Sequence, residues 1–189
     1  DTATPGQARV ANKIVSGLKE LRRMADDMLG FAAGTRCARQ PVTILELLRD
    51  VRDTVDGQLS PSSTIAVSVT DEDLQIVANR DAIKGALLNL VNNADQATDL
   101  DCNILLHAHR FGDSIHLCVT DNGPGITRDV QARLFEPFFT TRSNGTGLGL
   151  AVVQAVAAAH DGDVELHTSE LGSSFSIRLP AQPRSGDAL

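Results

Sequence analysis

Apolar residues recur along this chain with two different periods, and the order in which these periods alternate limits the folds open to it. Alternation at every second residue predicts strands at 65–69, 74–78, 103–111, 114–120, 164–169 and 174–179. Spacings of three and four predict helices at 44–56, 81–98, 129–134 and 148–160. Because paired strands lie between long helices, we expect an α/β fold class, a two-layer α/β sandwich with helices on one face of a mixed sheet.

The first forty residues differ in pattern and in charge from the rest of the chain. A helix start at Thr4 and Pro5, followed by an apolar stripe over residues 14–31, predicts one long N-terminal helix. A stripe this broad needs a partner helix, from another chain or from sequence that precedes this one. Residues 1–40 carry a net charge of +3 and residues 41–189 one of −10. We therefore expect two modules, a helical segment at 1–40 and an α/β domain at 41–189.

Charge, hydropathy and cysteine content narrow the class of protein. The net charge of −7 argues against nucleic acid as a partner, since phosphate binding needs a basic surface. No apolar run approaches the roughly 18 residues of a membrane span, so we expect no membrane contact from this segment. The cysteines at 37, 102 and 118 form no ligand spacing and are interpreted as reduced, buried thiols of a cytoplasmic protein. The chain begins at Asp1 rather than Met, so we expect a piece of a longer protein, either soluble or membrane-attached.

Three asparagines lie within five positions of the predicted helix at 81–98, although asparagine is a poor helix former. Asn89 and Asn93 are four residues apart, so their amides emerge on one face of the helix. Amide oxygens suit a Mg²⁺ ion that a nucleoside triphosphate already carries. The alternative is that these side chains only hydrogen-bond to neighbouring loops.

An acidic residue follows the predicted strand at 114–120. Asp121 comes directly after this strand, and Gly123 and Gly125 let the backbone approach closely behind it. A carboxylate accepts a hydrogen bond from the exocyclic amine of adenine and repels the carbonyl of guanine. The alternative is a simple tight turn.

A glycine-rich segment leads from a loop into the predicted helix at 148–160. Residues 143–150 read Ser-Asn-Gly-Thr-Gly-Leu-Gly-Leu. Such glycines let backbone N–H groups converge on an anion, and the N-terminus of a helix adds its positive dipole end. Just upstream, three phenylalanines lie within residues 134–142, in a predicted loop where a ligand or a partner domain has to cover them.

Together, these segments resemble the N, G1, F and G2 boxes of the ATP-binding domain of histidine kinases, which belongs to a superfamily shared with gyrase B, Hsp90 and MutL. The residues in these boxes are most similar to those of nitrogen-regulation and flagellar-regulation sensor kinases, which act on response regulators that activate σ54 promoters. Residues 9–35 are similar to the second helix of the dimerisation and phosphotransfer hairpin of such kinases. The resemblance covers about residues 41–180 and rests on the segments 89–96, 121–126, 134–142 and 143–150.

The resemblance implies a site for ATP and Mg²⁺. Asp121 would contact the adenine amine, Asn93 would hold the metal, and Asn89 would assist at the metal or the phosphates. Arg142 would reach the γ-phosphate, and Asn89 and Thr141 would help to position the phosphates. Gln96 stands where many family members carry Lys or Arg. The other expected nucleotide contacts are Gly123, Gly125, Ile126, Phe138, Thr140, Gly145, Thr146, Gly147, Leu148 and Gly149, with Ser173 or Ser174 reaching the adenine edge through water.

The resemblance also separates a kinase from an ATPase. Hydrolytic branches of the superfamily place a glutamate general base four residues before the metal asparagine, where this chain has Asn89. The family's phosphate acceptor is a histidine followed by an acidic residue with a proline close behind. That pattern fits none of the five histidines, at 107, 109, 116, 160 and 167.

We therefore expect the catalytic fragment of an ATP-dependent protein-histidine kinase. It would present the γ-phosphate to a histidine outside this chain and would not autophosphorylate alone. The expected partners are the acceptor helix of its own upstream part, a second copy in a homodimer, and a cognate response regulator. One alternative is a regulatory nucleotide-binding module without transferase activity. An anti-sigma-type Ser/Thr kinase is disfavoured by the Phe-rich segment and the bundle-type N-terminal helix.

Overall fold

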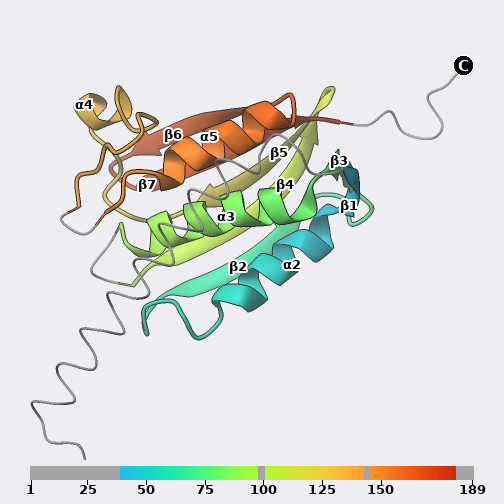
Figure 1. The fold of residues 1–189 in the computed structure, drawn as a ribbon. Coiled ribbons are helices and arrows are strands. Elements are labelled where there is room, and N and C mark those ends of the chain that lie inside the picture. The colour runs from blue at the N-terminus through green and yellow to red at the C-terminus, as the bar shows by residue number, and fades with distance from the viewer. Residues whose placement is uncertain (1–38, 98–100, 143–144, 182–189) are drawn as a thin grey trace, which may run out of the picture.

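The computed structural model describes residues 39–97, 101–142 and 145–181, and its strands and helices form two layers (Figure 1). Helices on one side cover one face of a five-stranded sheet, which confirms the predicted sandwich. In spatial order the strands are β2 (Thr64–Val69), β4 (Asn103–Phe111), β5 (Ser114–Thr120), β7 (Gly172–Pro180) and β6 (Asp163–Ser169). The sheet is mixed because β2 runs parallel to β4 and the other three pairs are antiparallel.

The helical layer consists of three main helices whose apolar sides meet the sheet. They are α2 (Ile44–Val55), α3 (Arg80–Asp95) and α5 (Gly149–Ala159), with one short helix, α4 (Arg128–Gln131), in the loop after β5. In α3 the buried residues recur at the predicted helical spacing, as in Ile83, Leu87 and Leu90. The helix begins at Arg80 because the Asn79 side chain accepts a hydrogen bond from Ala82 N at 2.9 Å and caps it.

A second, two-stranded sheet was not predicted from the sequence. It pairs β1 (Gln40–Thr43) with β3 (Gln75–Ala78) in antiparallel register. Strand β1 has four residues, of which Val42 alone is buried. A strand this short carries no alternation that a periodicity argument can detect.

Two contacts fix α3 relative to its neighbours. At its start, Asp50 of α2 accepts hydrogen bonds of 2.8 Å from Lys84 and from Arg80. The hydrogen bonds from Lys84 and Arg80 lower the pKa of Asp50 from its ordinary value. The buried His160, at the end of α5, accepts a hydrogen bond of 3.0 Å from Asn79 N at Nε2, while Nδ1 lies 2.7 Å from the carbonyl of Val156. The helices that carry the site described below are thereby held in fixed positions.

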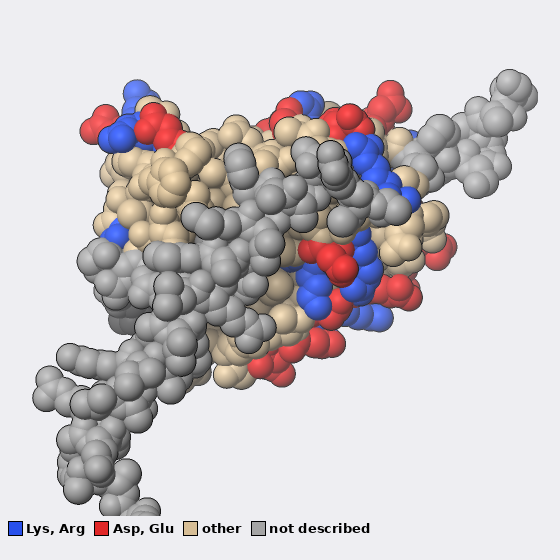
Figure 2. Space-filling model, in the orientation of Figure 1, with Lys and Arg blue, Asp and Glu red and all other residues tan. Residues whose placement is uncertain are grey.

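Several expectations concern residues 1–38, which lie outside the described residues. These are the N-terminal helix, its apolar stripe and the state of Cys37. Cys102 and Cys118 are buried and free, and burial raises the pKa of the Cys102 thiol to about 11. Within the described ranges, no helix has the length and hydropathy needed to cross a membrane. On the face shown in Figure 2, acidic and basic side chains are interspersed rather than separated by sign.

Candidate functional site

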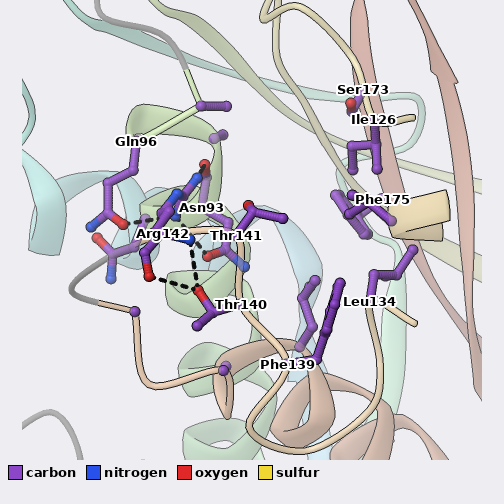
Figure 3. A pocket seen from close by; sticks show the side chains of 18 of the residues that line it. Asn93, Gln96, Ile126, Leu134, Phe139, Thr140, Thr141, Arg142, Ser173 and Phe175 are labelled. Atoms are coloured by element: carbon purple, nitrogen blue, oxygen red, sulfur yellow. Dashed lines mark hydrogen bonds between the residues drawn. The ribbon is translucent and has the colours of Figure 1, made fainter. Parts of the chain in front are cut away.

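A cavity of about 400 Å³ opens between α3, the loop that follows β5 and the segment that leads into α5 (Figure 3). This volume is in the range of small-molecule sites. Its two ends differ in character. The polar end is formed by Asn89, Asn92, Asn93, Gln96, Thr140, Thr141 and Arg142. The other end is mainly apolar and is formed by Ile126, Leu134, Phe139, Leu150 and Phe175, with Asp121 and Ser173 beside them.

The polar end is built on α3. Asn89 and Asn93, one helical turn apart, both line the cavity, as their spacing predicts. Nδ2 of Asn89 lies 3.5 Å from the carbonyl oxygen of Gly149, the first residue of α5. Two asparagines on successive turns therefore line the same volume, and Oδ1 of Asn93 lies 3.5 Å from Nη1 of Arg142.

Arg142 crosses the polar end and contacts α3 through its guanidinium group. Nη1 donates to Oε1 of Gln96 at 2.8 Å, and Nη2 donates to the main-chain oxygen of Asn93 at 3.0 Å (Figure 3). The Thr140 hydroxyl accepts a hydrogen bond of 3.1 Å from the backbone N–H of Arg142 and so shapes this turn. Sequence reasoning left the contact of Gln96 open. In the structure its side-chain oxygen contacts the guanidinium group of Arg142.

The carboxylate at the other end of the cavity is fixed by backbone donors. Asp121 follows β5 directly and is only 8% exposed. Its Oδ1 accepts hydrogen bonds from Gly123 N at 2.8 Å and from Ser173 N, on β7, at 3.2 Å. In the part of the chain that the structure describes, Oδ2 accepts no hydrogen bond from protein. One oxygen of Asp121 therefore sets the orientation of the carboxylate, and the other is available to a ligand.

Two glycines allow the loops around the cavity to approach each other closely. Gly125 has a φ of +77°, and a Cβ there would lie 1.9 Å from the carbonyl oxygen of Ser169. Gly147 has a φ of +67°, and its Cβ would lie 2.4 Å from the carbonyl carbon of Phe138. A side chain at either position is excluded both by backbone conformation and by space.

The Phe-rich segment sends one phenylalanine into the cavity and another outward. Phe139 lines the cavity, and the Arg133 guanidinium lies over its ring, 4.3 Å from the centroid. Phe138, expected at the site, is instead 71% exposed and does not line the cavity. Its backbone N–H donates to Gly147 O at 2.9 Å, so its main chain, rather than its ring, joins this loop to the glycine-rich segment.

The structure brings most of the other expected residues together at the cavity. Those that line it are Gly125, Ile126, Thr140, Thr141, Gly145, Thr146, Gly147 and Gly149. Gly123 and Leu148 do not line it, although Gly123 donates to Asp121. Of the two serines, Ser173 lines the cavity, whereas the Ser174 hydroxyl lies 2.8 Å from that of Thr120, because successive residues of a strand face opposite sides of the sheet.

Sequence reasoning missed several apolar walls of the cavity. Leu134 and Phe175 are far apart in the chain, and both line the cavity together with Phe139 (Figure 3). The cluster of phenylalanines at 135–139 could have indicated that Phe139 lines a site. The sequence around Phe175 indicates only a core residue of a strand. Asp121 is the only carboxylate among the described residues that line the cavity, and none of the five histidines of the chain lines it.

Comparisons with known proteins place the chain in a family. Residues 78–183 match the family model described as histidine kinase-, DNA gyrase B- and HSP90-like ATPase. The sensor protein kinase FleS of Pseudomonas aeruginosa is 37% identical over 181 residues, which are 95% of this chain and 45% of FleS. The chain spans between about a quarter and just under half of the length of the curated relatives that it matches.

Two solved structures of similar proteins bear on ligands and partners. Full-length ShkA in complex with AMPPNP superposes with a TM-score of 0.81 at 29% identity, covering 97% of this chain and 41% of ShkA. Histidine kinase ThkA in complex with the response regulator protein TrrA gives a TM-score of 0.78 at 25% identity, covering 97% of this chain and 54% of that chain.

Proposed function

The chain belongs to the histidine kinase-, DNA gyrase B- and HSP90-like ATPase family, and on that premise we propose that it is the ATP-binding catalytic part of a two-component sensor histidine kinase. The observation that carries the proposal is a single cavity with a fixed carboxylate at its apolar end and two asparagines and an arginine at its polar end. That arrangement matches the two chemically different halves of a nucleoside triphosphate.

The adenine ring fits the apolar end. Ile126, Phe139 and Phe175 provide apolar surface for a flat heterocycle. Oδ2 of Asp121 accepts a hydrogen bond from the 6-amino group, and it would face a carbonyl oxygen if guanine were bound. Ser173 lies beside this carboxylate, so its hydroxyl is the second polar group within reach of the base edge.

The triphosphate and its Mg²⁺ fit the polar end. The amide oxygens of Asn89 and Asn93 are hard ligands of the kind that Mg²⁺ accepts, and no carboxylate of the described residues lies at this end. A site without carboxylates suits an ion that arrives bound to phosphate oxygens. The ion would neutralise charge on the β- and γ-phosphates, while Arg142 donates hydrogen bonds to the terminal phosphate.

The cavity favours phosphoryl transfer over hydrolysis. A general base for water has to lie within hydrogen-bond reach of it. The position one turn before Asn93 holds an amide, Asn89, and the lining contains no histidine and no glutamate among the described residues. We therefore propose that ATP waits in this site for a histidine nucleophile from a segment outside the α/β domain at 41–189.

The relatives support proposals about partners. ThkA was solved with a response regulator, and FleS is a sensor kinase. We propose that this chain serves a cognate response regulator of the σ54-activating type, and that residues 1–40 belong to the helical hairpin through which the full protein dimerises. ATP as co-substrate and two buried thiols fit a cytoplasmic location.

The proposal is tested by supplying the acceptor separately. The chain is incubated with radiolabelled Mg·ATP, alone and with a polypeptide that carries the acceptor helix of its own upstream sequence. We expect acid-labile phosphate on the added polypeptide and none on the chain alone. Nucleotide binding without transfer under both conditions would point to a regulatory module, and rapid release of phosphate by the chain alone would point to an ATPase.

A further inference from the structure

The outer face of the five-stranded sheet carries a group of imidazole and thiol side chains that the nucleotide site does not use. Helices α2, α3 and α5 lie on the opposite face (Figure 1). Residues two apart in a strand share a face, and so do residues paired across two strands. In the β4–β5 ladder, His107 pairs with Cys118 and His109 pairs with His116, so these four side chains lie together on the outer face.

Three of these side chains bring their donor atoms close to one point. One donor atom each of His107, His109 and Cys118 lies within 4.8 Å of the other two. The rings of His107 and His109 are stacked, with centroids 5.9 Å apart and an interplanar angle of 11°. In a tetrahedral site with Zn–N near 2.0 Å and Zn–S near 2.3 Å, ligand atoms are about 3.5 Å apart. Side-chain rotations that close about 1 Å would therefore bring the three donors to bonding distance of one ion.

We propose that His107, His109 and Cys118 form a binding site for a divalent cation of the Zn²⁺ class. Two imidazole nitrogens and a thiolate are the ligands that Zn²⁺ and Co²⁺ prefer, whereas Mg²⁺ and Ca²⁺ prefer oxygen. Three protein ligands leave the fourth tetrahedral position to water. This site is chemically distinct from the polar end of the nucleotide cavity, where the donors are amide oxygens.

Hydroxyl groups contact two of the three proposed ligands, His107 and Cys118. The Ser176 hydroxyl on β7 lies 3.4 Å from Sγ of Cys118 and 3.1 Å from Nδ1 of His116. The Thr120 hydroxyl lies 3.4 Å from Nε2 of His107. Hydrogen bonds of this kind from neighbouring side chains orient the ligands of metal sites. The side chains of His107 and Cys118 are therefore already oriented before an ion binds.

The charges beside the ligands favour a cation. Glu165 on β6 pairs with Ser176, so its carboxylate lies in the cross-strand row that contains Cys118. Arg178 makes ion pairs with Asp163 and, at 3.7 Å, with Glu165. Two carboxylates and one guanidinium leave one net negative charge on this part of the sheet. His107 and His109 are half-buried, so an ion can reach their ring edges from solvent.

Cobalt titration of the complete chain, prepared without a histidine tag and without nucleotide, tests the site. Co²⁺ reports its ligands by colour, because a thiolate ligand adds a sulfur-to-metal charge-transfer absorption in the near ultraviolet. We expect one Co²⁺ per chain with this absorption, and displacement of the Co²⁺ by Zn²⁺. The absorption should disappear in Cys118→Ser and persist in Cys37→Ser and Cys102→Ser.

Histidine variants give a second, independent measurement. His109→Asn should weaken Co²⁺ binding by at least about tenfold, the smallest loss usual for changes around a metal site. His167→Asn, at an exposed position of β6, is the matched control and should leave the affinity unchanged. Circular dichroism melts show whether each variant is folded. The proposal is overturned by a wild-type chain without the charge-transfer band, by a band that survives Cys118→Ser, or by equal affinities of the two histidine variants.

Discussion

Arg142 and Gln96 are joined by a hydrogen bond of 2.8 Å from the guanidinium Nη1 to the side-chain Oε1, which links the loop after Phe139 to the end of α3. The same guanidinium donates to the main-chain oxygen of Asn93 at 3.0 Å. Both acceptors are neutral, and an anionic phosphate is a stronger acceptor than either. We therefore expect a bound triphosphate to draw Arg142 away from Gln96.

Replacing Arg142 should affect ATP more than ADP. In Arg142→Ala, the charge-assisted hydrogen bond to the terminal phosphate is lost, which costs about 1.5–3 kcal/mol. We expect ATP affinity to fall by about tenfold or more and ADP affinity to fall much less, as measured by isothermal titration calorimetry. Gln96→Ala removes one of the two competing acceptors of Arg142 and should leave ATP binding as tight as in wild type, or tighter. Arg52→Ala, on α2, is the control. Equal losses for ATP and ADP in Arg142→Ala would place this side chain away from the γ-phosphate.

Replacing Asp121 should remove the preference for adenine. Asp121→Asn keeps the size of the side chain and replaces one acceptor with a donor. We expect ATP binding to weaken by about 1–3 kcal/mol and the ratio of ATP to GTP affinity to fall toward one. Competition binding with both nucleotides measures this ratio. The exposed Asp113→Asn, in the β4–β5 turn, is the matched control. Unchanged discrimination in Asp121→Asn would refute the assignment of the base end.

Nucleotide binding should slow hydrogen exchange in the segment 137–142. Phe138 is 71% exposed, and the hydrogen bonds from Arg142 to Gln96 and to the main chain of Asn93 go to neutral acceptors that a phosphate can replace. We expect ATP to slow its exchange more than ADP does, since Arg142 is proposed to contact the terminal phosphate. Strand β5, at the centre of the sheet, serves as the internal reference. Exchange that is equally slow with and without ATP would count against a ligand-ordered loop.

Two glycine-to-alanine changes should alter stability in opposite directions. Gly125→Ala places a Cβ 1.9 Å from the carbonyl oxygen of Ser169 at a φ of +77°, so we expect the free energy of unfolding to fall by about 2 kcal/mol or more. A Cβ at Gly85, in the interior of α3, meets nothing within 4 Å. Because alanine restricts the unfolded chain, Gly85→Ala should raise the free energy of unfolding by about 0.5–1 kcal/mol. Urea denaturation measures both, and a stable Gly125→Ala would mean that this loop can rearrange.

The ion pairs of Asp50 should give a pH-dependent contribution to stability. Hydrogen bonds from Lys84 and Arg80 lower the pKa of this carboxyl in the folded state below its ordinary 3.8. Its contribution is therefore fully present above pH 3.8 and is lost as the pH falls through the folded-state pKa. The side chains are about one-third exposed, so we expect less than about 1 kcal/mol.

The measurement compares urea unfolding of wild type and Asp50→Asn at pH 7 and near pH 2.5. The difference between the two proteins should be present at pH 7 and shrink at the lower pH. Asp53→Asn, whose carboxylate is more exposed, controls for the change of net charge. A difference that is the same at both pH values would show that Asp50 acts through packing rather than through its charge.

Periodicity was sufficient for the parts of the fold that are long and regular. Strands β4 and β5 were predicted with the bounds that they have, because alternation runs up to the Phe111–Asp113 turn and resumes directly after it. Helix α3 was placed to within one turn. Strand β1 was not predicted, because its four residues show no repeat. Its position depends on pairing with β3, 35 residues further along the chain.

The candidate site was predictable where a side-chain type has a chemical reason to be present. The amides of α3 and the carboxylate after β5 belong to this class. Local conformation was not predictable in the same way. Phe138 turns outward because its φ is +67° and its main chain is hydrogen-bonded to Gly147. The pairing of Arg142 with Gln96, 46 residues apart, depends on how one loop folds over one helix.

The hydrogen bond between Ser173 N and Asp121 also sets an order of events during synthesis. Asp121 is added to the growing chain 52 residues before Ser173. Gly123 N lies next to the carboxylate in the chain, but Ser173 N reaches it only after β7 has paired with β5, and β7 is the last of the described strands in chain order. A nascent chain that stops short of β7 already contains every asparagine and glycine of the cavity but lacks one of the two backbone donors that orient its carboxylate. Discrimination between nucleotides is therefore among the last properties that this domain acquires as it is made.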